Sequence, residues 1–306
     1  MAILHANLEP DIRLAAQLDQ ALLITLTDMA TIRNTAAVDF HGTVNGSGSD
    51  TARLRYVSLG GADHFESVGE DATASVTALV DTSVDIAVTR STLRREIGDI
   101  ATSTGFAQDV DPQTLATDMV ASYDGYFNSL LTAAGATAST TVGSSGVDFS
   151  HDDFMDGLFT LELASVPGPY FAILHPRQFA DWQESLRAEG GSTQFMAATA
   201  DILTIKGQGF AGSHSGVDIW KMSDVTESGG NKLGFMFGAN TFGYKVALIN
   251  SRSMIGAGSS VAVAVDEVLV EITRDVNRAV TNIVGNAWVG LSLKEQSRIV
   301  GIVTDA

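Results

Sequence analysis

The segment Val166–Trp182, with the sequence VPGPYFAILHPRQFADW, constrains the fold of this chain more than any other stretch. A Pro-Gly-Pro turn leads into the apolar run Tyr170–Leu174, which is typical of a buried strand. Pro176 then fits the first position of a helix, where its missing N–H costs no hydrogen bond. Apolar residues follow at helical spacing until a Gly-Gly pair ends the pattern. The segment therefore predicts a strand joined directly to an amphipathic helix, with His175 as a structural residue between them.

Composition and charge exclude several classes of function. The chain has 306 residues, a formal net charge of −18 and no cysteine, which excludes disulfides, thiolate metal sites and cysteine nucleophiles. There is no Lys or Arg between Arg95 and Arg177. Because such an acidic surface repels phosphates, specific DNA recognition is not expected. No stretch reaches the roughly 18 apolar residues of a membrane span, and the N-terminus lacks a signal-peptide pattern, so we expect a cytosolic protein with no membrane partner.

The first part of the chain predicts two segments that cannot form a core alone. Pro10–Met29 has the pattern of an amphipathic helix, and extended, Gly/Ser-rich chain follows it. Ala52–Leu59 and Val76–Arg90 predict the two strands of a long hairpin with an acidic tip. Because a two-stranded ribbon is marginal alone in water, we expect both segments to pack on neighbours. The candidate contact residues are Leu14, Leu18, Leu22 and Leu26 in the helix, and Arg53, Arg55, Asp63, His64, Glu66, Glu70 and Asp71 in the hairpin.

The rest of the chain predicts one long helix and then mixed α and β structure. The helix covers residues 111–135, with Asp111 as its cap, Pro112 in its first position and Gly135 at its end. At 1.5 Å per residue it forms a rod of roughly 36 Å. The further elements expected are a helix at Asp152–Leu163, strands at Val217–Met222, Leu233–Phe237, Val261–Val265 and Val268–Thr273, and two last strands at Asn282–Leu293 and Arg298–Thr304.

This order of elements resembles the major capsid proteins of tailed bacteriophages. The phrases VPGPYFAILHPRQFADW, GFAGSHSGVDIWKMSDV, GFMFGANTFGYK and VLVEITRDVNRAVTNIVGNAWVGLSL are similar to segments of that fold, in the same order. The resemblance implies an α+β fold in five parts. These are an N-terminal arm (1–49), an extended β-hairpin loop (50–95), a peripheral domain (96–150) with its spine helix (111–135), an axial domain (151–265), and returning strands shared by both domains (266–306).

The resemblance also implies a function. Copies of such a protein self-assemble as pentamers and hexamers into an icosahedral shell that encloses double-stranded DNA non-specifically. The implied location is the virion, assembled in the host cytoplasm, with scaffolding, portal and decoration proteins as further partners, no catalytic residue, no metal and no cofactor. Some members of the family cross-link their shells through a lysine on the extended loop. This chain has no lysine in residues 50–95, so we expect a shell without cross-links.

Two other patterns suggest different chemistry. Gly207, Gly209 and Gly212 match the G-x-G-x-x-G pattern of a nucleotide-binding enzyme, but that site needs a helix to open at the third glycine. Here SHSGVDIW follows, which predicts a turn and a strand, so we favour a loop. The four aspartates of Asp148–Asp156 could suggest a metal site. Ser150 as a helix cap, with acids in the first turn, explains them better.

Three alternatives to a capsid protein stay open at this point. An encapsulin-type compartment shell would have the same fold and enclose a cargo enzyme. A nucleotide-dependent enzyme would depend on the glycines near residue 210, and a non-capsid virion protein is the third alternative.

Overall fold

The computed structural model describes residues 35–43, 50–57, 81–98, 112–188, 195–199, 209–247, 260–265, 268–275 and 280–305, with Ile32, Glu70, Asn277 and Arg278 besides. The candidate contacts Leu14, Leu18, Leu22, Leu26, Asp63, His64, Glu66 and Asp71, and also Gly207, lie outside the described residues. Within the described part, no helix is long and apolar enough to cross a membrane.

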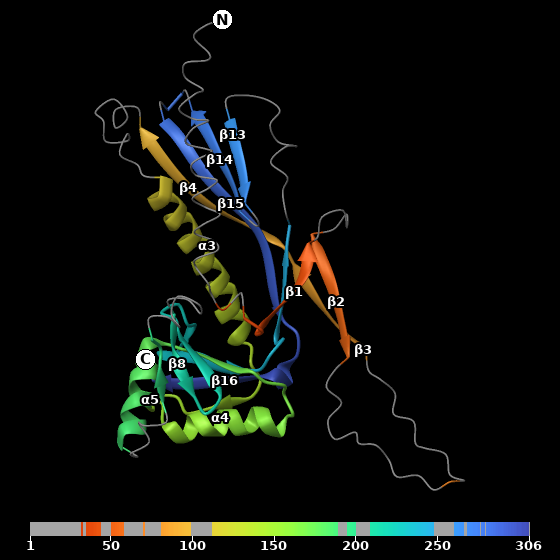
Figure 1. Cartoon of the computed structure of the whole chain (residues 1–306), viewed down its shortest axis with the longest axis vertical. Helices are drawn as coiled ribbons and strands as arrows, with labels where there is room; N and C mark the ends of the chain where they lie inside the picture. The colour runs from red at the N-terminus through yellow and green to blue at the C-terminus, as the bar shows by residue number, and fades with distance from the viewer. Residues whose placement is uncertain are drawn as a thin grey trace, which may run out of the picture.

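A six-stranded sheet with one long helix packed along it forms the first part of the molecule (Figure 1). The strand order is β1-β12-β15-β14-β13, and β4 also pairs with β15. The elements are β1 (Val38–Thr43), β4 (Thr89–Gly98), β12 (Phe242–Val246), β13 (Ser260–Val265), β14 (Val268–Asp275), β15 (Val280–Leu293) and the helix α3 (Pro112–Gly135). The strand β15 is the centre of this sheet, because it pairs with β4, β12 and β14.

The helix α3 lies along the sheet because its apolar residues recur at spacings of three and four. Met119, Tyr123 and Phe127 are buried in one cluster with Val270 and Ile283 of the sheet. The long helix at 111–135 is therefore confirmed from Pro112 onward, and Asp111, its expected cap, lies outside the described residues.

An eight-stranded sheet with two helices forms the second part of the molecule. Its order is β5-β16-β11-β6-β9-β8-β7, with β10 beside β11. The elements are β5 (Thr141–Val142), α4 (His151–Leu163), β6 (Tyr170–Leu174), α5 (Pro176–Ala188), β7 (Met196–Ala197), β8 (Phe210–His214), β9 (Val217–Lys221), β10 (Glu227–Ser228), β11 (Asn231–Phe237), the 3₁₀ helix η5 (Gln296–Arg298) and β16 (Ile299–Asp305). Figure 1 shows α4 and α5 at the base of the molecule.

The strand β6 and the helix α5 confirm the prediction for the segment Val166–Trp182. On one face of β6, Ala172 and Leu174 join the core that includes residues of α4 and α5, whereas Phe171 and Ile173 join the core under α3. Burial on both faces explains why the run is continuously apolar.

His175 has the structural position expected of it. Its Nδ1 accepts a hydrogen bond from the Arg177 N–H at 3.2 Å, and its own N–H donates to Gln178 Oε1 at 3.0 Å. Gln178 is fully buried, and its Nε2 donates to the Lys232 carbonyl and to Thr304 Oγ1. The start of α5 is thus tied to β11 and β16.

The hairpin differs from the sequence prediction at its second strand. The hairpin consists of β2 (Thr51–Val57) and β3 (Asp81–Ala87). The sequence predicted one hairpin strand from Val76 to Arg90, but the hairpin strand β3 ends at Ala87. After Val88 the chain enters β4, where Arg90 pairs with Trp288 of β15. The hairpin is therefore continuous with β4, a strand of the six-stranded sheet.

Each sheet combines segments far apart in the sequence. Residues 38–43, which belong to the expected arm, pair in parallel with β12 of the same chain. β12 and β13, within the range 151–265, lie in the six-stranded sheet. Of the returning strands, β14 and β15 belong to the six-stranded sheet and β16 to the eight-stranded sheet.

Candidate assembly surfaces

The root of the hairpin packs tightly on β12 and β15. Ala52, Leu54 and Ile86 are buried on the inner face of the hairpin. A Cβ atom at Gly243 of β12 would lie 2.6 Å from Leu54 Cδ1. A Cβ atom at Gly290 of β15 would collide with the carbonyl oxygen of Ala87, the last residue of β3. The two glycines thus permit the hairpin to lie close to the backbone of β12 and β15, and this contact fixes the direction of the hairpin.

The outer face of the hairpin is charged and exposed. The Arg53 Nε donates to Asp85 Oδ1 at 2.8 Å and its Nη2 donates to Asp85 Oδ2 at 3.2 Å. This pair raises the pKa of Arg53 and lowers the pKa of Asp85, in both cases chiefly through the hydrogen bonds. Arg55 and Glu70 are also exposed. The surface position of these candidate contact residues leaves them accessible to a neighbouring subunit.

A groove of about 510 Å³ lies between the hairpin, α3 and the end of β15. We call it the hairpin groove. Its apolar lining consists of Val84, Leu130, Ala133, Ala134, Leu291 and Leu293, and its polar lining of Thr137, Ser292, Lys294 and Gln296. Among these lining residues there is one cation and no acid.

Lys294 at this groove is joined to β1. Its ammonium contacts the carboxylate of Asp39, and His41 Nε2 lies 2.9 Å from the same carboxylate oxygen. Burial alone would raise the pKa of Asp39, but Lys294 and His41 together hold that pKa below its ordinary value. The pKa of His41 is lowered by burial and by the charge of Lys294.

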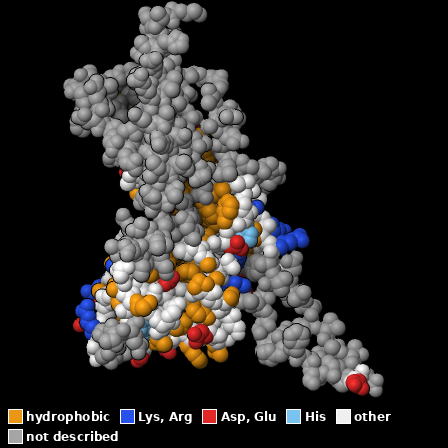
Figure 2. Space-filling view, viewed as in Figure 1, with side chains coloured by type: hydrophobic (Ala, Val, Ile, Leu, Met, Phe, Trp, Pro, Cys, Tyr) orange, Lys and Arg blue, Asp and Glu red, His pale blue; other side chains and the backbone are white. Residues whose placement is uncertain are grey.

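The outer side of α4 is both apolar and acidic. The helix has six exposed positions, which fall on one side of it. We call this side the α4 face: it consists of Asp152, Met155, Asp156, Phe159, Glu162 and Leu163. Figure 2 shows orange hydrophobic and red acidic side chains together at the base of the molecule, where Figure 1 places α4.

The start of α4 is capped by Ser150, as expected, and Asp153 takes part in the cap. The Asp153 N–H donates to Ser150 Oγ at 3.1 Å, and the Ser150 N–H donates to Asp153 Oδ2 at 3.1 Å. This reciprocal capping box satisfies two backbone donors at the start of the helix. No group of three or more His, Cys, Asp or Glu side chains in the described part of the chain could hold a metal ion.

The glycine pattern near residue 210 runs into the strand β8, so the loop that the sequence analysis favoured there is wrong, whereas the absence of a helix after the third glycine agrees with it. Gly209 precedes β8, and Gly212 lies within β8 opposite Ile219 of β9. No helix therefore opens at the third glycine to present its N-terminus to a pyrophosphate. Gly212 has φ +149°, and a Cβ there would collide with the Met196 carbonyl oxygen. A strand-to-strand contact thus accounts for this glycine.

Sequence reasoning missed a buried polar centre on β15. Asn286 is 1% exposed, and its Oδ1 accepts hydrogen bonds from Arg90 Nη2 at 2.6 Å and from Thr92 Oγ1 at 3.0 Å. Its Nδ2 donates to Glu271 Oε2 at 3.2 Å. Asn282, four residues earlier, accepts from an arginine of β4 in the same way. The one signal in the sequence for this polar centre is that Asn282 and Asn286, four residues apart, lie on the same face of one strand.

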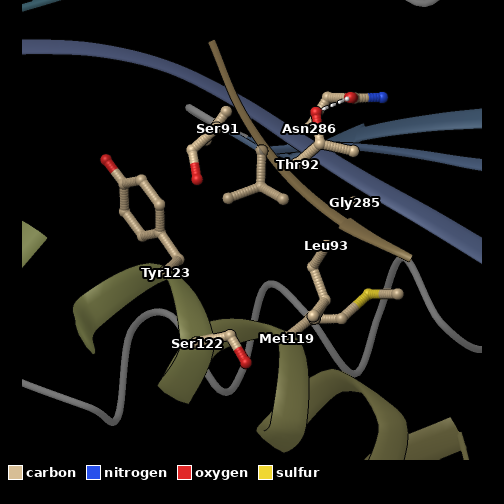
Figure 3. A pocket seen from close by; sticks show the side chains of 10 residues that line it. Ser91, Thr92, Leu93, Met119, Ser122, Tyr123, Gly285 and Asn286 are labelled. Carbon is tan, nitrogen blue, oxygen red and sulfur yellow. Dashed lines mark hydrogen bonds between the residues drawn. The ribbon is translucent and has the colours of Figure 1, made fainter. Parts of the chain in front are cut away.

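A small cavity of about 150 Å³ lies beside this centre, between β4, α3 and β15 (Figure 3). Figure 3 shows Thr92 and Asn286 joined by their hydrogen bond, with Leu93 and Met119 close together below. Gly285 leaves room here, since the nearest atom to a Cβ there would be Met119 Sδ at 3.9 Å.

Comparison with known proteins gives similarity in structure only. No protein-family profile matches the chain, and no curated protein matches it in sequence. The capsid of Ralstonia phage GP4 is similar with a TM-score of 0.61 and 9% identity, covering 92% of this chain and 90% of that chain. A structure of Mycobacterium phage Che8 has a TM-score of 0.51 and 16% identity, covering 84% and 85%. The holo-SrpI encapsulin complex from Synechococcus elongatus PCC 7942 has a TM-score of 0.54 and 11% identity, covering 84% and 82%.

The chain therefore has the α+β fold that tailed-phage capsid proteins share with encapsulins. The resemblance seen in the sequence phrases is confirmed at the level of the fold.

Proposed function

We propose that this chain is the major capsid protein of a tailed bacteriophage, which assembles as pentamers and hexamers into an icosahedral shell around double-stranded DNA. The observation that carries the proposal is the fold, which matches a phage capsid over 92% of the chain. The five-part organisation, with arm, extended loop, peripheral domain, axial domain and returning strands, belongs to the proposal.

The hairpin supports assembly on physical grounds. Its inner face is fixed on β12 and β15, but its outer face, with Arg53 and Arg55, is exposed. Because the packing of the inner face leaves this outer face exposed, a neighbouring subunit can contact it without displacing the hairpin. Obligate interfaces commonly bury more than about 2,000 Å², which compensates for the cost of association.

The charge of the chain supports a container for DNA. With a net charge of −18, the protein repels phosphates on average, so packaged DNA would be enclosed without tight binding. We propose that the arm residues Leu14, Leu18, Leu22 and Leu26, and the hairpin residues Arg53, Arg55, Asp63, His64, Glu66, Glu70 and Asp71, contact neighbouring subunits. Scaffolding, portal and decoration proteins are the further partners of such a shell, and the virion is its final location.

An encapsulin-type compartment is the second candidate, because the SrpI encapsulin matches the chain with a TM-score of 0.54. Such a shell would enclose a protein cargo and no genome. The contents of the particle distinguish the two candidates.

Electron microscopy of the expressed full-length protein, followed by analysis of nuclease-treated particles from the native source, tests the proposal. Icosahedral particles that protect double-stranded DNA are the expected result. Particles that contain a protein cargo and no DNA would favour the compartment, and a protein that stays monomeric would contradict both candidates.

A further inference from the structure

A buried histidine lies where α4 and α5 meet the end of β8. His214, the last residue of β8, is 1% exposed. Its ring centroid lies 5.1 Å from that of His151, 5.2 Å from that of Trp182 and 5.6 Å from that of Phe154. Two of these rings come from α4 and one from α5. The imidazole of His214 is therefore a contact between both helices and the eight-stranded sheet.

The rings around His214 favour its neutral form. Phe154 and Trp182 are fully buried and belong to one apolar core cluster with residues of β6, β9 and β16. A proton on His214 would place a positive charge beside this cluster. Burial disfavours the charged form of an ionisable group, so protonation of His214 costs more in the packed state than in water.

His151 increases this cost. It is the first residue of α4, and its N–H donates to Ser185 Oγ of α5 at 3.0 Å. Its ring Nδ1 is buried, and no hydrogen bond to that atom occurs in the described part of the chain. The positive end of a helix dipole disfavours a cation at this position, and two neighbouring imidazolium rings repel each other. The two histidines together therefore resist protonation while α4 is packed.

The other charged side chains near this cluster are mostly acids at the surface. The elements around His214 carry Asp152, Asp153, Asp156 and Glu162 in α4, Arg177, Asp181, Glu184 and Arg187 in α5, and Asp218 and Lys221 in β9, and β7 carries none. Four of these acids, namely Asp152, Asp156, Glu162 and Glu184, are exposed, so water and salt screen their charges.

The remaining three acids have partners of their own. Asp153 takes part in the cap of α4, and Asp218 accepts a hydrogen bond from Ser213 Oγ at 2.6 Å. Asp181 lies 3.2 Å from Arg177, and burial raises the pKa of Asp181. Because a raised pKa makes acid stabilise the folded chain, Asp181 acts in the opposite direction to a buried histidine.

We propose that His214 makes the attachment of α4 sensitive to acid, so that protonation of His214 loosens α4 from α5 and β8. This inference goes beyond the proposed shell function and does not depend on it. A histidine in an open segment takes up a proton near pH 6.5, at about its ordinary value. The loosened state then binds more protons than the packed state. The attachment of α4 is therefore complete above about pH 6.5 and weakens as the pH falls below that value.

Hydrogen exchange of the full-length chain, in the same assembly state at pH 7.5 and pH 5.5, tests this inference. Mass spectrometry of peptides from α4 and from α3 gives a protection factor for each helix after correction for the intrinsic exchange rate. Protection of α4 should fall by about tenfold more than protection of α3, because one proton is taken up on opening. An equal change in both helices would contradict the inference.

Substitution of the histidine identifies the group that titrates. His214→Phe keeps an aromatic ring without a titratable nitrogen, and His214→Leu is a second variant of similar volume. Whichever of them folds should lose the extra pH dependence of α4, while Asp181 and His175 stay in place. His41→Gln is the matched control, because His41 lies on β1 in the six-stranded sheet, and it should keep the extra pH dependence. A folded His214 variant with the same pH dependence as the unmodified chain would overturn the proposal.

Discussion

Leu54 of the hairpin lies so close to Gly243 of β12 that a Cβ on Gly243 would come within 2.6 Å of the Leu54 Cδ1 atom. The Ile86 Cδ1 atom would lie 3.1 Å from the same Cβ. The hairpin therefore packs directly on the backbone of β12, and its direction depends on the absence of a side chain at Gly243.

Gly290→Ala should destabilise the protein by about 1–3 kcal/mol, because its new Cβ would press on the backbone carbonyl of Ala87, which has no rotamer to change. Gly243→Ala should cost less, since Leu54 Cδ1 is the end of a side chain. Denaturant unfolding measures both. Gly285→Ala in the same strand as Gly290 is the control, because its Cβ meets nothing closer than 3.9 Å. Equal stability of Gly290→Ala and Gly285→Ala would contradict the account of the hairpin root.

Asn286→Leu should lower the free energy of unfolding by about 1–3 kcal/mol, because it removes the hydrogen bonds that the buried Asn286 makes with Arg90, Thr92 and Glu271, two of which are charged. Urea denaturation with a fixed m-value checks this value. Asn286→Asp keeps an acceptor for Arg90 but replaces the donor to Glu271 by a second carboxylate oxygen, so it should be destabilised as well. A more stable Asn286→Leu variant would show that these hydrogen bonds contribute nothing net.

Gln178→Leu should cost a similar free energy of about 1–3 kcal/mol, because the Thr304 hydroxyl, the Lys232 carbonyl and the His175 N–H all lose a hydrogen bond to its buried amide. The thermal midpoint of the folded chain is the measurement. Arg187→Ala, at an exposed position of the same helix, is the control and should change the midpoint little. If both variants melted at the same temperature, the buried amide would have no part in holding the start of α5.

Acid should remove the contribution of the Asp39 pair with Lys294. The pKa of Asp39 is lower in the folded than in the unfolded chain, so the pair stabilises the protein above the unfolded pKa of about 3.9. This stability is lost as the pH falls through the folded pKa. Asp39→Asn should therefore be less stable than the unmodified chain near neutral pH, by less than about 1 kcal/mol, because the pair is partly exposed. A difference in unfolding free energy that persists unchanged at pH values below both pKa values would contradict this assignment.

Mature particles should release only single chains in a denaturing gel. The cross-link of some related shells needs a lysine on the extended loop, and residues 50–95 contain none. A ladder of covalent oligomers from untreated, unmodified particles would contradict this prediction.

The sequence was sufficient where local pattern decides the structure. The spacing of Met119, Tyr123 and Phe127 defines α3, and Pro176 defines the start of α5. Ser150 forms the cap of α4 that its position before the helix indicates. These features depend on residues a few positions apart, so the sequence displays them directly.

The contacts between distant segments could not be predicted in the same way. The approach of Leu54 to Gly243 joins positions far apart in the chain, and the departure of the chain from the hairpin at Val88 depends on pairing with β15.

The exposed apolar residues of α4, which are Met155, Phe159 and Leu163, show the same limit within one helix. Both sides of α4 carry large apolar residues, so their spacing does not tell which side faces the core. Leu158 is buried with Phe154, whereas its neighbour Phe159 is exposed. Only the packing of α4 on the sheet distinguishes them.

The most direct test of the central claim is a cryo-electron microscopy reconstruction of the particles that the full-length chain forms. The account predicts a closed icosahedral shell of pentamers and hexamers, in which the hairpin of each subunit contacts a neighbour. Particles isolated from the native source should hold nuclease-protected double-stranded DNA. A chain that remains monomeric, or particles in which the outer face of the hairpin meets only solvent, would contradict it.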